Sequence, residues 1–184
     1  MRDHIAYFVY VAKHKYYVLE GGLRLGGIPL WRLLVHDSSK FSKEEWLPYV
    51  KQFYNPDGTK RTVRDATGAY DPSVQSEAFK AAWAHHWHEN DHHWNFWLAR
   101  NPKQWAIQDR SFTPEEYDTP FPMPSVAIRE MCVDWRAASL AQGNGVDIEG
   151  WYWQNKKNMI LHAETKKGIG SVLLEMWSKG IIHS

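Results

Sequence analysis

The side chains able to do chemistry gather in a few short blocks of this sequence. The first block is His36-Asp37-Ser38-Ser39-Lys40, which follows a strongly apolar stretch. A carboxylate carried into an apolar interior must be paired or must bind a metal. Imidazole and carboxylate are both ligands for divalent transition metals. The alternative, for a His-Asp pair that stands alone, is a helix-end cap with a salt bridge.

Two further residues place this pair in a wider pattern. His14 precedes it, on the same side of its segment as the apolar Val11. Asp134 follows it, close to the apolar face of a later segment. The order His14, His36-Asp37, Asp134 therefore offers four ligands, and we predict that they hold a metal ion.

A second block, at residues 83–94, contains five histidines: His85, His86, His88, His92 and His93. On one continuous helix, at roughly 100° per residue, His86 and His93 share the apolar face with Asn90 between them. We therefore predict His86 and His93 as inward ligands. A helix break at Asp91 would reopen the choice between His92 and His93. The alternatives to a site are a surface run of histidines and core histidines with hydrogen-bond partners.

The expected substrate contacts lie near these blocks. Lys40 stands three residues after Asp37, and a cation beside a metal suits a phosphate or another anionic oxygen. A solvated loop lysine is the equal alternative. Trp46 and Trp94 are candidates to stack on a base, and Asn90 is a further candidate contact.

Helical periodicity dominates the segments that must position these residues. The predicted helices cover residues 3–19, 28–36, the stretch after 42–45, 71–90 with a continuation through 98 as the alternative, 125–140 and 151–177. The second is apolar nearly all round and is expected to be buried. We expect Gly21-Gly22 to end the first helix, Ser42 and Glu45 to form a capping box, and Pro48 to bend the helix that follows.

Other features of these segments complete the expected fold. Asp71 should cap the long helix, and the last helical region should break near His162 and near Gly168-Ile169-Gly170. Residues 101–124 predict a long loop, a candidate lid, and Glu130 should be a surface residue. Strand patterns are nearly absent. We therefore predict one all-α domain over residues 1–184.

In this order of residues the sequence resembles the HD superfamily of metal-dependent phosphohydrolases. The resemblance implies a bundle of helices whose interior holds His14, His36, Asp37 and Asp134. Extra histidines between the His-Asp pair and the final Asp are found in binuclear HD proteins. Examples are the HD-type cyclic-dinucleotide phosphodiesterases and the mixed-valence di-iron oxygenases that resemble myo-inositol oxygenase. One departure is that the two predicted histidines of the second block are seven residues apart, whereas those families take them from separate helices.

The sequence also looks like an uncharacterised family of bacteria and tailed phages. The likeness lies in the blocks His-Asp-Ser-Ser-Lys and Asn-Asp-His-His-Trp and extends over roughly residues 10–175. It carries no assigned activity, and therefore it supports the site more than the reaction.

These resemblances imply a phosphohydrolase that uses one or two ions of Fe, Mn, Zn, Ni or Co. Asp37 and Lys40 would be its catalytic residues, and a small anionic molecule such as a nucleotide its substrate. A di-iron oxygenase of the same fold is the first alternative. A phage structural or interaction protein with a structural metal is the second.

Composition limits the expected binding partners and cellular location of the protein. Lys and Arg (22) nearly balance Asp and Glu (21), so no strong nucleic-acid signal is present. Apolar runs are too short to span a membrane. The single cysteine, Cys132, excludes an internal disulfide and fits the cytoplasm of a bacterial or phage-infected cell. An oligomer remains compatible with the sequence.

Overall fold

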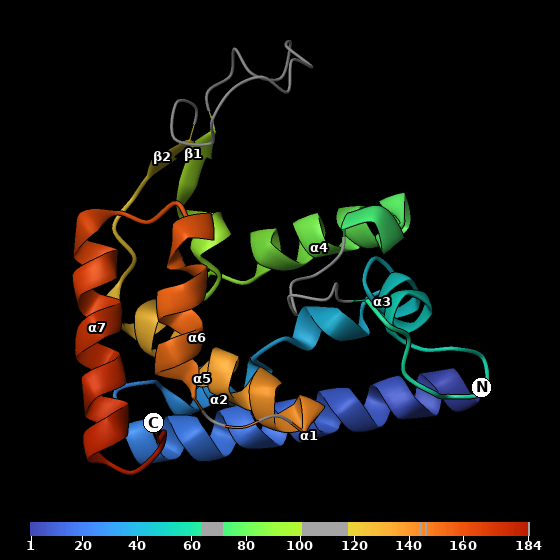
Figure 1. Cartoon of the computed structure of the whole chain (residues 1–184), viewed down its shortest axis with the longest axis horizontal. Coiled ribbons are helices and arrows are strands. Elements are labelled where there is room, and N and C mark those ends of the chain that lie inside the picture. The colour runs from blue at the N-terminus through green and yellow to red at the C-terminus, as the bar shows by residue number, and fades with distance from the viewer. Residues whose placement is uncertain (64–71, 101–117, 144, 146, 184) are drawn as a thin grey trace.

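The computed structural model describes residues 1–63, 72–100, 118–143, 145 and 147–183. It confirms the all-α class, because a bundle of helices makes up most of the chain (Figure 1). The α-helices are α1 (Arg2–Leu25), α2 (Leu30–Val35), α3 (Trp46–Phe53), α4 (Glu77–Glu89), α5 (Ser125–Gln142), α6 (Ile148–Asn155) and α7 (Ala163–Ser178). Short 3-10 turns are η1 (Ser38–Phe41), η2 (Pro72–Val74), η3 (Trp94–Trp97) and η6 (Lys156–Asn158). Strands β1 (Leu98–Arg100) and β2 (Asp118–Pro120) pair antiparallel, with Leu98 opposite Pro120.

Helix α1 extends along one edge of the molecule and contributes to two apolar clusters (Figure 1). The larger cluster joins the second half of α1, through Val18 and Leu25, to α5 and α7. The smaller one joins its first half, through Tyr7 and Val11, to α3 and α4. His14 lies on the same buried face of α1, one turn after Val11 and one turn before Val18. The fold therefore places a polar side chain between two apolar clusters.

The predicted end of α1 at Gly21-Gly22 is wrong, because these glycines serve close packing. A Cβ atom on Gly22 would lie 2.8 Å from Leu33 Cδ1, so any larger residue would displace the buried Leu33 side chain that packs α2 against α1. The helix ends instead at Gly26 and Gly27, whose φ angles are 75° and 73°. Glycine adopts this left-handed region without the steric cost of a Cβ atom.

The predicted burial of the segment at residues 28–36 is also wrong. In α2 the side chain of Leu33 is buried against α1, while Trp31 and Leu34 are 62% and 57% exposed. An apolar composition predicts burial only when neighbours cover every face of the helix, and within the described part of the chain α2 packs by one face.

Two expectations about α3 are wrong. The capping box does not form, because Glu45 is buried and its carboxylate contacts His85 and His86. Helix α3 begins at Trp46, so Pro48 lies in its first turn, where a backbone amide needs no partner within the helix.

Helices α4 and α7 also differ from expectation at their boundaries. Ser76 caps α4 by accepting a hydrogen bond from the amide of Phe79, while Asp71 lies outside the described residues. Helix α4 ends at Glu89, before His92 and His93. The predicted break near His162 is confirmed, because His162 is the N-cap of α7, whereas the predicted break at residues 168–170 is wrong, because α7 continues through them. Of the predicted loop, residues 101–117 lie outside the described part, and 118–120 form β2.

Two glycine-to-alanine substitutions test the close packing of α1 against α2. Gly22→Ala should lower the free energy of unfolding by about 1–3 kcal/mol, because the new methyl group collides with Leu33. Gly170→Ala is the matched control, since nothing lies within 4 Å of its Cβ position in α7. It should raise the free energy of unfolding by about 0.5–1 kcal/mol through helix propensity. Urea unfolding measures both, and equal effects would contradict the packing argument.

Candidate metal centre

Four side chains from different parts of the chain converge between the two apolar clusters. We call them the first donor set: His14 of α1, His36 and Asp37 after α2, and Asp134 of α5. All four are buried. Asp37 has a φ of 55°, the left-handed value that only it shows among the described non-glycine residues. Such a conformation costs on the order of 1 kcal/mol and is concentrated at functional sites. The predicted convergence of these four side chains is confirmed, because their ligand atoms all lie within 4.8 Å of one another.

The spacing within the first donor set suits a single small cation. His14 Nε2 lies 3.1 Å from Asp37 Oδ2, 3.1 Å from Asp134 Oδ1 and 3.2 Å from His36 Nε2. His36 Nε2 lies 3.3 Å from Asp134 Oδ1. Ligands about 2.1 Å from an ion are separated by about 3.0 Å at right angles and about 3.4 Å at the tetrahedral angle. These four separations fall in this range, and His36 Nε2 lies slightly farther from Asp37 Oδ2, at 3.5 Å.

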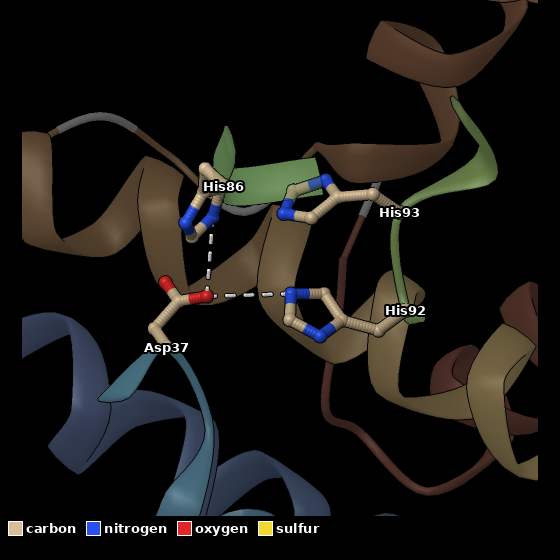
Figure 2. Close-up of side chains that lie close together, drawn as sticks. All are labelled: Asp37, His86, His92 and His93. Atoms are coloured by element: carbon tan, nitrogen blue, oxygen red, sulfur yellow. Dashed lines mark ion pairs between the residues drawn. The ribbon is translucent and has the colours of Figure 1, made fainter. Parts of the chain in front are cut away.

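A second donor set shares Asp37 with the first. Figure 2 shows the imidazoles of His86, His92 and His93 turned toward the Asp37 carboxylate. Asp37 Oδ1 lies 3.3 Å from His86 Nε2 and 3.4 Å from His92 Nε2. Because Oδ2 faces His14, this carboxylate presents one oxygen to each set.

Several donor atoms are buried without a hydrogen bond. In the second donor set they are Asp37 Oδ1, His92 Nε2 and His93 Nε2. In the first donor set, His14 Nδ1 is also buried without a partner. Asp37 Oδ1 is close enough to the imidazoles of His86 and His92 for ion pairs, but it forms no hydrogen bond with either ring. Leaving a buried polar atom unsatisfied costs about 1–3 kcal/mol. A cation between the imidazoles of His92 and His93 and the Asp37 carboxylate would satisfy the first three atoms, so the residues present fit a bound metal. It would not satisfy His14 Nδ1, because His14 faces the centre with Nε2.

Two glutamates hold the imidazoles in the orientation that a metal requires. Glu130 Oε1 accepts a hydrogen bond from His36 Nδ1 at 2.9 Å, and Glu45 Oε2 accepts one from His86 Nδ1 at 2.8 Å. A neutral imidazole that donates from Nδ1 keeps its lone pair on Nε2, the atom that faces the centre. The expectation that Glu45 is a cap and Glu130 a surface residue is wrong, because both are buried behind the donors.

An ion-pair network explains why the segment after α4 turns back toward the centre. Arg32 Nε donates to Glu130 Oε2 at 2.7 Å, and its Nη1 donates to Asp91 Oδ2 at 3.1 Å. Asp91 immediately precedes His92, whose Nδ1 lies 3.5 Å from Glu130 Oε1. The network therefore ties α2, α5 and the turn after α4 into one support.

The structure brings His86 and His93 together as predicted, and adds His92, which the helical-face count excluded. That count assumed one continuous helix, and α4 ends at Glu89. Asp91, a cap residue by type, was the signal for the break. His85 contacts Glu45 instead of the centre, and His88 bonds the carbonyl of Ala84 in its own helix.

The four predicted substrate contacts lie in different surroundings in the structure. Lys40 is buried, with Nζ 2.5 Å from Asp37 Oδ2, so it is no solvated loop lysine. Asn90 donates to Ser39 Oγ at 2.9 Å and to the carbonyl of His86 at 2.6 Å, contacts that position the second donor set. Trp46 donates to a histidine near the N-terminus. Trp94 packs against the larger apolar cluster.

The charges of the centre favour ionised carboxylates. Burial alone would raise the pKa of Asp37, but His36, Lys40 and His86 hold it well below its usual value. Burial likewise would raise the pKa of Asp134, which hydrogen bonds from His14 and His36 hold well below its usual value.

The histidines divide into two groups. Burial alone would lower the pKa of His36, but Asp37, Asp134 and Glu130 together raise it to about 9. Burial lowers the pKa of His92 and holds the pKa of His93 well below its usual value. Neighbouring imidazoles lower both pKa values further. Near neutral pH the metal-free centre therefore holds a proton on His36, while His93 offers a free lone pair.

The raised pKa of His36 predicts how the stability of the metal-free protein depends on pH. A pKa higher in the folded state than the unfolded value of 6.5 adds stability that is complete below pH 6.5 and is lost as pH rises through about 9. Urea unfolding of metal-free protein should show a loss on the order of 3 kcal/mol across this window. His36→Gln should flatten the profile, and an unchanged slope in that variant would show that another group is responsible.

Comparison with known proteins identifies a family and no activity. No helix of the described residues is long and apolar enough to cross a membrane. No curated protein and no solved structure gives a significant match. Residues 3–175 match the model of a family described as being of unknown function, a span that includes every residue of both donor sets. Because this match covers most of the chain, the protein belongs to that family of unknown function, DUF5662.

Proposed function

We propose that this protein is a metal-dependent phosphohydrolase of HD type that acts on a nucleotide or another small phosphate ester. The observation that carries the proposal is the shared carboxylate of Asp37, with Oδ2 toward His14 and Oδ1 toward His86 and His92. A carboxylate between two sets of imidazoles is suited to two adjacent ions. Paired ions recur in enzymes that cleave phosphate esters.

The donor chemistry favours transition metals. Nitrogen donors outnumber oxygen donors in the second set, and the two are equal in the first. Such sets suit Fe, Mn, Zn, Ni or Co better than Mg or Ca, which prefer oxygen ligands. When bound, these ions would activate a water molecule and polarise a phosphoryl oxygen.

Charge balance favours an anionic substrate. Four buried carboxylates surround the centre: Asp37, Glu45, Glu130 and Asp134. Among the described lysines and arginines, Lys40 bonds to Asp37 and Arg32 bonds to Glu130. Arg32 also pairs with a further carboxylate, that of Asp91. The centre without metal is therefore negative, and two divalent ions would reverse its sign. Lys40, which pairs with Asp37 at the centre, is the proposed contact for the substrate phosphate.

The three imidazoles of the second set also supply enough donors for a di-iron oxygenase of the same fold. We prefer hydrolysis because it is the commoner chemistry of the superfamily that the sequence resembles. A purely structural metal would need a closed set of ligands, whereas a catalytic one keeps an open position. These alternatives are separated by the activity experiment below.

Metal content should depend on the donor sets in a defined pattern. Asp37→Asn should lose most bound metal, because it weakens both sets, whereas Asp134→Asn and His93→Gln should each lose about half. His88→Gln is the control, since His88 bonds its own helix and faces away from the centre. Elemental analysis of protein purified without added metal measures the ratio. Full metal content in Asp37→Asn would refute the assignment.

Activity should be hydrolytic and should depend on Lys40. Protein loaded with Mn or Co, and kept without oxygen, should release phosphate or nucleoside from a panel of nucleotides and phosphomonoesters. Lys40→Met should lower kcat/KM by about 100-fold, because it removes the cation proposed to meet the phosphate. His88→Gln should retain full activity. Absence of hydrolysis, together with substrate-dependent oxygen uptake in iron-loaded protein, would favour the oxygenase; absence of both reactions would favour a structural metal.

A further inference from the structure

Helix α1 carries two apolar seams on opposite sides. The inner seam faces the core and consists of Tyr7, Val11, His14, Val18, Gly21 and Leu25. The outer seam consists of Ile5, Val9, Ala12, Tyr16, Leu19 and Leu23. Each outer residue follows an alternating spacing of four and three positions, which is the pattern of a coiled-coil contact. The two seams are offset by two positions, or roughly 200° around the helix, so the outer one points away from the core.

Most of the outer seam is exposed. Ile5, Tyr16 and Leu23 are 59%, 63% and 61% exposed. Leu19 is the exception, because it is partly buried and packs against the larger apolar cluster. None of its six residues carries a charge. A helix that is apolar on both sides is expected to be covered on both, and a contiguous exposed apolar strip marks an interaction site.

The segment from α2 to η1 runs beside this seam without covering it. Three contacts fix its course, antiparallel to α1: Gly22 with Leu33, Lys15 with the carbonyl of His36, and Phe8 with Phe41 at a ring distance of 6.4 Å. The α1 residues in these contacts each lie one position before an outer-seam residue. The segment therefore borders one flank of the seam, and α2 adds the exposed side chains of Trp31 and Leu34 beside it.

The outer seam is complementary to itself when reversed. In an antiparallel pair centred on position 14 of α1, Ile5 of one copy meets Leu23 of the other, and Val9 meets Leu19. The small Ala12 then faces the large Tyr16, so the middle of the seam can pack without a gap. A surface that matches its own reverse is what a two-fold dimer requires, because both partners contribute the same patch.

The available area is sufficient for such a pair. Ile5, Phe8, Val9, Tyr16 and Leu23 are each between 44% and 63% exposed. Together they offer on the order of 600 Å² per copy, so a pair that covered them would bury on the order of 1,000 Å², which is about the lower limit for a biological interface. Helix α1 also lies along the outer edge of the molecule (Figure 1).

We infer that the protein forms a two-fold homodimer in which the α1 helices of two copies pair antiparallel through the outer seam. The occupant of the seam is a second copy of this chain. The inference is independent of the metal centre, because no outer-seam residue belongs to a donor set.

Sedimentation velocity across a range of concentrations tests the dimer. Full-length protein should sediment at twice the chain mass of 21.6 kDa. Tyr16→Lys should raise the dissociation constant by more than about 100-fold, because it puts a charge at the centre of the apolar contact. Leu174→Lys is the matched control, since Leu174 of α7 is 67% exposed but lies outside the seam. Circular dichroism should show both variants folded. A monomer at tens of micromolar, or a dimer unaffected by Tyr16→Lys, would overturn the inference.

Cysteine cross-linking tests the direction of pairing. An equal mixture of the Ala12→Cys and Tyr16→Cys proteins, treated with oxidised glutathione, should form mixed disulfide dimers, since these positions face each other in the antiparallel pair. Ala12→Cys alone should cross-link poorly, because its two copies are offset by about 6 Å along the helix axis. The native Cys132 is buried and should not interfere. Efficient cross-linking of Ala12→Cys with itself, and none in the mixture, would show a parallel pair and overturn the arrangement.

Discussion

An ionised carboxylate in the interior, that of Asp37, is the constraint on which the rest of this structure depends. Burying an unpaired charge costs many kcal/mol, so the fold must surround it with partners. Lys40 lies against one oxygen, and imidazoles from α1, α4 and the turn after α4 approach both oxygens. The left-handed backbone at Asp37 is part of the same solution, because it occurs where the chain turns from α2 into η1.

A second layer of charged groups keeps the donors in place. Glu45 and Glu130 each hold an imidazole by Nδ1 and leave Nε2 directed toward the centre. Arg32 connects Glu130 to the turn that carries His92 and His93. The orientation of the donors is therefore decided by residues that do not belong to either donor set, a common property of metal sites in proteins.

Helix α1 links the centre to the surface. Its inner seam contains His14 between the two apolar clusters, and its outer seam is the proposed dimer contact. Because α1 is a single rigid element, pairing of two copies would brace the helix that positions this donor. The segment from α2 to η1, which carries His36 and Asp37, borders the same surface.

The sequence by itself determined the all-α class and six of the seven donors of the two sets, including the shared Asp37. Residue type and helical periodicity suffice for these, since they are local properties of the chain. Only the tertiary structure decided that His92 joins the second set, that Glu45 and Glu130 support the imidazoles, and that α2 leaves Trp31 exposed. Each of these depends on where α4 ends or on which elements pack together. Asp91 marked a possible end of α4, but which elements then pack together depends on residues far apart in the chain, and no local pattern in the sequence encodes those contacts.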